Sequence, residues 1–120
     1  MLVKQVSGKM ASFTLFCCIS ILGGMSVASA DAIADGKKVA FDRKKGNCMT
    51  CHIMAGATLA GNIGPPLVAM KARFPDKAKL RAQIWDATAK NPNTMMPPFG
   101  LHRILSEKDI DLVTEYIYSL

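Results

Sequence analysis

Two cysteines and a histidine, Cys48, Cys51 and His52, lie in the stretch NCMTCHIM and form a C-x-x-C-H motif. This spacing suits three kinds of chemistry. The three side chains could supply part of a zinc site, the cysteines could form a redox-active dithiol, or the group could anchor a haem covalently. The rest of the chain decides between them, because each kind of site requires further residues or a particular fold.

Covalent haem attachment is the interpretation that the motif favours, because C-x-x-C-H is the signature of c-type haem binding. Two thiols one helical turn apart can reach the two vinyl groups on one edge of a porphyrin. The next imidazole is then held beneath the iron as its proximal ligand. We therefore predict one haem c, bound covalently through Cys48 and Cys51, with His52 as an iron ligand.

The zinc and dithiol alternatives each lack something in the sequence. A structural zinc site takes four Cys or His ligands, and only His102 remains outside the motif once the first 30 residues are set aside. A thioredoxin-like dithiol belongs in a βαβ setting, and no segment shows useful strand-like alternation.

The sixth iron ligand is expected from the loop NPNTMMPPFG, residues 91–100. Its prolines exclude regular structure and stiffen the loop, so a thioether can be held over the iron without a large entropy cost. We predict Met96 as the ligand because it directly precedes Pro97, and Met95 and His102 are the alternatives. Histidine–methionine ligation raises the reduction potential, whereas bis-histidine ligation lowers it.

The first 30 residues are predicted to be a cleaved secretory signal peptide. Two lysines precede the apolar run ASFTLFCCISILGG, and SVASA ends in small residues, so cleavage is expected near Ala30. The apolar run is shorter than the roughly 20 residues that a spanning helix needs. Cys17 and Cys18 follow Leu15 and Phe16, which argues against a lipid-anchored cysteine. Residues 31–120 are expected to be a periplasmic cytochrome c domain without a membrane span.

This expected mature domain is small and mildly basic. Removing Lys4 and Lys9 with the first 30 residues leaves 13 of the 15 basic side chains and all nine acidic ones, a formal net charge of +4. It has no basic stripe interleaved with aromatic residues, so nucleic-acid binding is not expected. A domain of this size buries only a thin core and often needs a cofactor to complete it.

Helical periodicity predicts an all-α fold of three to five helices around one covalently bound haem. We expect helices over about 32–45, 74–90 and 106–120, and a short one from Leu67 that places Met70 in the core. Asp76 and Ser106 are the predicted N-caps. The apolar stripes expected on the two later helices are Leu80, Ile84 and Ala87, and Ile110, Val113, Ile117 and Leu120.

Three further positions have expected packing roles. Gly36 lies inside the first helix at a cost of about 1 kcal/mol relative to alanine, so we predict a close helix crossing there. Tyr116 and Tyr118 are expected to contribute to that crossing. Trp85 is expected either on the haem edge or as plain core filling.

Together these motifs resemble the class I cytochromes c and, in detail, the SoxX family, the small haem subunits of the SoxAX complexes of bacterial sulfur oxidation. The resemblance covers essentially the whole mature chain and rests on GNCMTCH (46–52), GNIGPPL (61–67), RFPD (73–76), IWDAT (84–88), NPNTMMPPFG (91–100) and ILSEKDID (104–111). It implies that Pro65 packs beside His52 and offers its carbonyl to that ring. It also implies that Met96 is the iron ligand.

The resemblance further implies an electron-transfer subunit with no catalytic residue of its own. A SoxX-like chain forms a heterodimer with a SoxA-like cytochrome, which carries the L-cysteine S-thiosulfotransferase chemistry. The complex couples thiosulfate to a cysteine of a SoxYZ-like carrier, and the SoxX-like subunit passes the electrons to a small soluble cytochrome. The alternatives are a free-standing periplasmic electron carrier and a ligand-binding haem protein with an open sixth site.

Overall fold

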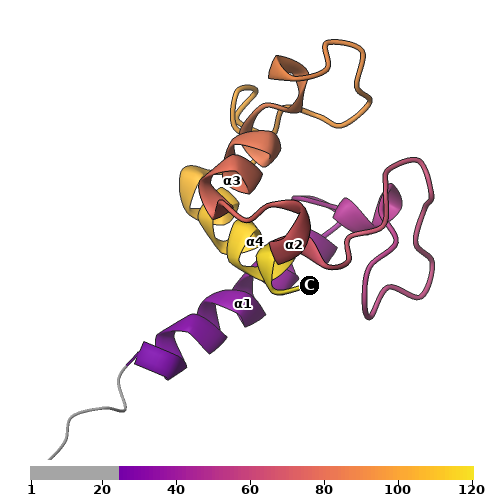
Figure 1. The fold of residues 1–120 in the computed structure, drawn as a ribbon. Coiled ribbons are helices and arrows are strands. Elements are labelled where there is room, and N and C mark those ends of the chain that lie inside the picture. Colours follow the sequence, from indigo (N-terminus) through magenta and orange to yellow (C-terminus); the bar gives the residue numbers. More distant parts are fainter. Residues whose placement is uncertain (1–24) are drawn as a thin grey trace, which may run out of the picture.

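The computed structural model describes residues 25–120, and most of the predicted signal peptide lies outside this range. Its elements are four α-helices and two 3₁₀ turns: α1 (Met25–Phe41), η1 (Cys48–Thr50), α2 (Met70–Arg73), α3 (Lys77–Trp85), η2 (Ala87–Ala89) and α4 (Glu107–Ser119). Residues 25–120 contain no β-strand (Figure 1). The predicted all-α fold is confirmed, whereas cleavage near Ala30 stays a prediction.

The first helix begins earlier and ends earlier than the sequence predicts. No glycine or proline interrupts residues 25–31, and α1 starts at Met25. It ends at Phe41 because Asp42 turns the chain: the Asp42 carboxylate accepts the Lys44 N–H at 2.8 Å, and its carbonyl accepts the Asn47 N–H at 3.1 Å. The chain therefore leaves the helix four residues before the predicted end and enters a tight loop that leads to Cys48.

Helices α1 and α4 cross at Gly36, as predicted. A Cβ atom at this position would lie 1.9 Å from the Leu112 carbonyl oxygen and 2.9 Å from Tyr116 Cβ, so no side chain fits. Tyr116 also meets Phe41 edge-to-face, with 6.2 Å between the ring centroids. The two helices cross in Figure 1, with the N-terminal part of α1 projecting away from the body of the domain.

The two later helices place their predicted apolar stripes in the core. Leu80, Ile84 and Ala87 are buried on the α3 and η2 side, and α4 buries Ile110, Val113 and Ile117. Both N-caps are confirmed, because the Asp76 carboxylate accepts from Ala78 N at 2.9 Å and Ser106 Oγ accepts from Asp109 N at 3.1 Å. Leu120, the last residue of the predicted stripe, is only partly buried, and its carbonyl accepts a hydrogen bond from the Ala69 N–H.

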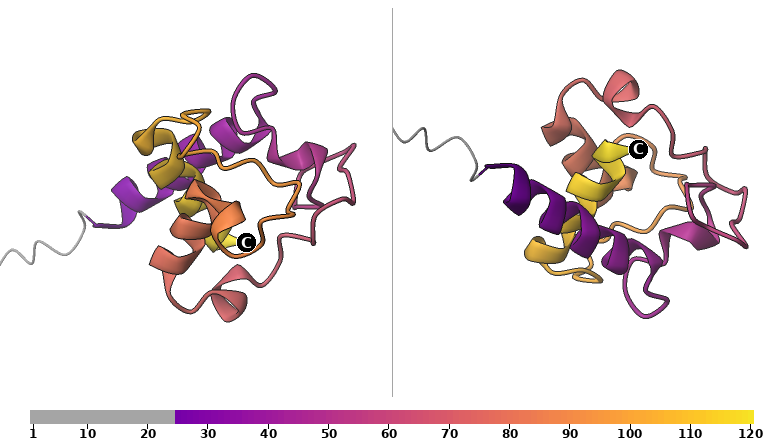
Figure 2. Two further views of the ribbon diagram at one scale, coloured as in Figure 1. Left: turned by 90° about the horizontal axis from the view of Figure 1, so that it is seen from above. Right: turned by 90° about the horizontal axis from the view of Figure 1, so that it is seen from below.

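Two long segments without regular secondary structure connect this helical frame. One runs from η1 to α2 and the other from η2 to α4, and they lie on the same side of α4 in both views of Figure 2. The helix predicted from Leu67 is confined to a single turn, α2, and Met70 at its start is 1% exposed. Within residues 25–120 no helix has the length and apolar character to cross a membrane.

The Gly36 crossing yields a first prediction. Gly36→Ala should lower the free energy of unfolding by about 1–3 kcal/mol, because the added methyl group must push α1 and α4 apart. This loss should appear even though alanine favours a helix by about 1 kcal/mol. Urea unfolding of the purified protein measures it. Ala34→Ser, on the exposed face of the same helix, should change little, and equal stability of Gly36→Ala and the wild type would contradict the crossing.

Candidate functional site

An apolar cavity of about 760 Å³ lies between the two long segments and α4. Its inner walls come from buried side chains of α2, α3 and α4 and from the buried Phe99. Polar and charged side chains, among them Arg43, Asn47 and Asn93, join the lining. A mainly apolar cavity with a few convergent polar groups is the usual form of a cofactor or ligand site, and its volume falls within the range of about 300–1,000 Å³ for such sites.

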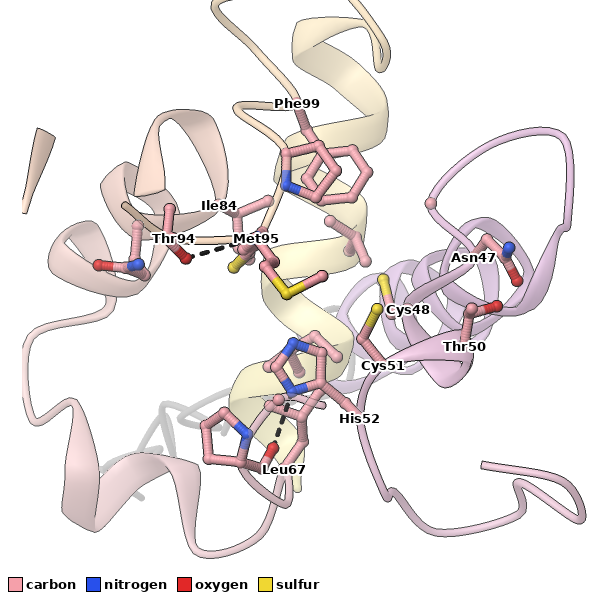
Figure 3. Close-up of a pocket in the computed structure, with 18 of the residues that line it drawn as sticks. Asn47, Cys48, Thr50, Cys51, His52, Leu67, Ile84, Thr94, Met95 and Phe99 are labelled. Atoms are coloured by element: carbon pink, nitrogen blue, oxygen red, sulfur yellow. Dashed lines mark hydrogen bonds between the residues drawn. The ribbon is translucent and has the colours of Figure 1, made fainter. Parts of the chain in front are cut away.

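The C-x-x-C-H motif forms one wall of this cavity. Residues 48–50 make the 3₁₀ turn η1, and the Cys48 carbonyl accepts hydrogen bonds from Cys51 N at 3.2 Å and from His52 N at 3.0 Å. This turn places both thiols and the imidazole on the same side of the chain. Figure 3 shows the sulfur atoms of Cys48 and Cys51 next to the His52 ring at the cavity wall, and neither cysteine is in a disulfide.

The loop that follows holds the His52 ring in one orientation. His52 Nδ1 lies 2.7 Å from the Pro65 carbonyl oxygen, so the expected hydrogen bond is present. Because a carbonyl can only accept, Nδ1 carries the proton and Nε2 keeps its lone pair. Gly64 lies against the ring, since a Cβ atom there would come within 2.4 Å of His52 Cε1. The imidazole is therefore oriented and left with a free nitrogen that can bind a metal.

Three backbone hydrogen bonds fasten this loop to the motif. Gly61 N donates to Met49 O at 2.9 Å, Gly64 N to Cys51 O at 2.8 Å and Leu67 N to Ile53 O at 2.8 Å. Their regular spacing pairs the segment that contains Pro65 with the segment that contains His52. The position of the Pro65 carbonyl is thus set by the same residues that form the wall.

The methionine loop contributes to the lining as well. Met95 and Met96 both line the cavity, but Met95 is 76% exposed whereas Met96 is half-buried and packs against the core. Met96 N donates to Thr94 Oγ1 at 3.2 Å, which fixes the turn before the two prolines (Figure 3). His102 is exposed, does not line the cavity and is held by its backbone N–H to Pro98 O. The structure therefore brings the two methionines to the site and leaves His102 outside it.

Burial controls the state of the Cys48 thiol. It raises the pKa of Cys48 from 9.0 to about 11, so this group is a protonated thiol at neutral pH. Cysteines of redox-active dithiols have lowered pKa values instead, because their thiolates must attack disulfides. Together with the absence of strands in residues 25–120, this raised pKa argues against the dithiol interpretation.

The zinc interpretation has no support in the described part of the chain. Among residues 25–120 no three His, Cys, Asp or Glu side chains come together in an arrangement that could hold a metal ion. Since a structural zinc site needs four such ligands, the motif lacks the partners that would complete one.

The structure decides one open packing role and changes another. Of the two roles predicted for Trp85, it takes core filling: it packs against the core and on Gly100, where a Cβ atom would lie 2.2 Å from the indole ring, and it does not line the cavity. Tyr118 does not take part in the α1 crossing, because its hydroxyl donates to Pro75 O at 3.3 Å. Trp85 thus lies against the loop that contains Gly100, and Tyr118 lies against Pro75 before α3. The sequence pattern predicts neither neighbour.

Two contacts of the site were not predicted from the sequence. Arg73 Nη1 donates to the Pro66 carbonyl at 2.7 Å, directly beside the carbonyl that holds His52. Lys45 Nζ lies 3.1 Å from Asp109 Oδ1 and ties the loop before the motif to the start of α4. The two residues of the second pair are far apart in sequence, and no periodic or capping signal relates the members of either pair.

The residues at the cavity fit a c-type haem. Two thiols and an oriented imidazole stand on one wall, a methionine loop stands on another, and buried apolar side chains form the interior. Apolar walls of this extent need a group of cofactor size to cover them, because unfilled apolar cavities are strongly destabilising. Sulfur and imidazole ligands together suit iron in a haem.

Comparisons with known proteins point the same way. Residues 31–117 match the family described as Cytochrome C oxidase, cbb3-type, subunit III. A protein of Aquifex aeolicus (strain VF5) named "Uncharacterized lipoprotein" is 32% identical over 76 residues, which cover 62% of this chain and 37% of the relative. The chain thus spans well under half the length of that relative.

The pair Lys45–Asp109 yields a pH-dependent prediction. Partial burial raises the pKa of Asp109, but hydrogen bonds from Lys45 and Ser106 and the Lys45 charge outweigh it, so the pKa lies below its usual 3.8. The carboxylate therefore adds stability above that value, and the gain is lost as the pH falls through the lowered pKa.

Asp109→Asn should accordingly cost about 1 kcal/mol or less at pH 7, because the pair is partly exposed, and the difference from wild type should shrink below about pH 4. Urea unfolding at several pH values measures this, and a double-mutant cycle with Lys45→Gln isolates the pair. A difference that stays constant down to pH 2 would show that the pair's charge plays no part.

Proposed function

The chain belongs to the family of c-type cytochromes described as Cytochrome C oxidase, cbb3-type, subunit III, and on that premise we propose that it is an exported electron-transfer protein with one covalent haem c. The observation that carries the proposal is the convergence on one apolar cavity of Cys48, Cys51 and an oriented His52 with a methionine loop. We assign the protein no catalytic residue.

Each residue of the site has a proposed task. Cys48 and Cys51 hold the porphyrin through thioether bonds, and His52 Nε2 and Met96 Sδ are the iron ligands. Bound there, the haem supplies a reversible one-electron change at its iron. The buried walls exclude water, and Pro65 keeps the imidazole proton on Nδ1. Histidine–methionine ligation fits a carrier that accepts electrons at a raised potential.

Covalent attachment is tested by removing the anchors. The double variant Cys48→Ala, Cys51→Ala should release its haem into acidic acetone, because no thioether bond remains, whereas the wild-type haem stays with the protein. Staining for haem after denaturing electrophoresis measures the same difference. A wild-type protein that is colourless, with both thiols titratable, would overturn the proposed function.

The choice of the sixth ligand is tested by comparing the two methionines. Met96→Ala should abolish the weak red absorption band of methionine bound to ferric iron, because the proposed sulfur ligand is removed. Met95→Ala is the matched control and should keep the band, since Met95 is 76% exposed. Loss of the band in Met95→Ala alone would reverse the assignment.

Export is part of the proposal. The predicted signal peptide supports it, because C-x-x-C-H attachment takes place on exported chains. The Aquifex relative is named a lipoprotein, which also supports an extracytoplasmic location. We place the mature protein in the periplasm.

The partner is proposed from the surface around the cavity. All seven exposed large apolar side chains of the described residues lie in the two long segments, between η1 and α2 and between η2 and α4: Ile53, Leu59, Ile63, Val68, Met95, Leu101 and Ile104. Arg43, Lys45 and Arg73 line the cavity itself and form its cationic rim, and no Asp or Glu side chain of residues 25–120 lines it. An apolar surface among cations fits a partner protein whose own apolar docking face is bordered by carboxylates.

We propose on this basis, and on the resemblance to the SoxX family, that the partner is a SoxA-like cytochrome. The chain would then accept electrons from the coupling of thiosulfate to a SoxYZ-like carrier and pass them to a small soluble cytochrome. The free-standing electron carrier is the second candidate, and the cationic rim is equally compatible with it.

Purification of the tagged protein from cells grown on thiosulfate separates the two candidates. A SoxA-like subunit should copurify as a second haem-stained band. Arg43→Glu, at the cavity, should reduce its recovery because it reverses one charge of the rim, and Lys108→Glu, on α4 outside both segments, should not. Recovery of the protein alone under all salt conditions would favour the free-standing carrier.

A further inference from the structure

Arg73, at the end of α2, is fixed between the core and the loop that holds His52. Its Nη1 donates to Pro66 O at 2.7 Å and lies 3.4 Å from the sulfur of Met70. Met70 is 1% exposed, so the guanidinium rests on a side chain that is packed in the core. Arg73 thereby joins a buried residue of α2 to the backbone next to Pro65.

In the described part of the chain, no backbone group holds the carbonyl oxygens of Pro65 and Pro66 in place. Pro65 and Pro66 lack N–H groups, and within residues 25–120 no backbone N–H donates to either carbonyl oxygen. Side chains take that place, since His52 Nδ1 donates to the Pro65 carbonyl and Arg73 to the Pro66 carbonyl. The orientation of both carbonyls therefore depends on these two donors.

The proline ring couples the two carbonyls. They belong to successive peptide planes that share the Cα atom of Pro66, and the ring of Pro66 locks the φ angle between those planes. Only the ψ angle of Pro66 remains soft. When Arg73 fixes the Pro66 carbonyl, that remaining rotation is restricted, and the direction of the Pro65 carbonyl is restricted with it.

We propose that Arg73 is a positioning residue for His52, acting through the Pro65–Pro66 peptide to hold the acceptor of the Nδ1 proton. This inference rests on the proposed function in one respect, that His52 binds the iron. It assigns a functional role to a side chain that lines the cavity and whose hydrogen bonds go to Pro66 and Met70, not to His52 or the cysteines. The strength of the Nδ1–H bond sets the basicity of the imidazole, so Arg73 also tunes the proximal ligand.

The test follows the Nδ1 proton of His52 by ¹⁵N–¹H NMR in the reduced holoprotein. Arg73→Gln should speed its exchange with solvent by about tenfold, because a charge-assisted hydrogen bond that restrains the acceptor is lost. Arg73→Lys keeps the charge and one donor and should restore part of the protection. It also serves where Arg73→Gln does not fold.

Two controls separate positioning from loss of charge and from general loosening. Lys71→Gln removes one cation from the same short helix without touching the loop and should leave the exchange rate unchanged. Tyr118→Phe removes the hydrogen bond to Pro75 O just beyond α2 and should lower overall stability without a selective effect on His52. Equal exchange rates in Arg73→Gln and Lys71→Gln would overturn the inference.

Failure of the inference is distinguishable from failure of the proposed function. If the wild-type protein carries no haem, the proposed function itself fails. If it carries haem and the Nδ1 proton responds to Arg73→Gln no more than to the controls, only the positioning role of Arg73 is wrong. A selective, partly rescued acceleration supports both.

Discussion

The close approach of α1 and α4 at Gly36 is the constraint on which the rest of the structure depends. Helix α1 leads through one tight loop into η1, which begins at Cys48 and is followed directly by Cys51. Helix α4 supplies part of the opposite lining with Val113 and Ile117. The distance between the thiols and that lining is therefore set by the crossing and not by the loops. The pair Lys45–Asp109 adds a second tie between the same two parts. A site built from irregular segments thus inherits its dimensions from two packed helices.

On the side of the cavity that carries His52, the structure is held mainly by backbone hydrogen bonds. Three regularly spaced hydrogen bonds join residues 49–53 to residues 61–67, and glycines at 61 and 64 let the two segments approach as closely as these bonds require. The Pro65 carbonyl then has one direction, and the His52 ring has one protonated nitrogen. The methionine loop on the other side is held differently, by its prolines and by short-range hydrogen bonds such as Thr94 N to Asn91 O and Met96 N to Thr94 Oγ1. Its end is tied to α3, because Gly100 N donates to the Trp85 carbonyl.

Local signals in the sequence predicted much of this fold, but they could not predict contacts between distant residues. The α3 and α4 stripes, the Asp76 and Ser106 caps and the Gly36 crossing follow from spacing and residue type, and all are present except that Leu120 is only partly buried. The end of α1 was misplaced because an Asp42 side chain competes for backbone N–H groups, which periodicity does not register. Arg73 was missed because its nearest acceptor, the Pro66 carbonyl, lies in loop backbone. The role of Trp85 was left open because the sequence is compatible with a place at the haem edge and with a place in the core. The C-x-x-C-H motif could be recognised from its residue types and spacing, but the orientation of its side chains is given only by the structure.

The placement of the two irregular segments has a consequence for how the molecule is assembled. The α1–α4 and α3–α4 contacts belong to the helices alone, and the cysteines follow directly from the end of α1. The methionines come from a separate segment, about 45 residues further along the chain. Attachment of a porphyrin to the cysteines and its ligation by a methionine would therefore draw on separate stretches of the chain. The methionine segment could take its place over the cofactor after the thioether bonds had formed.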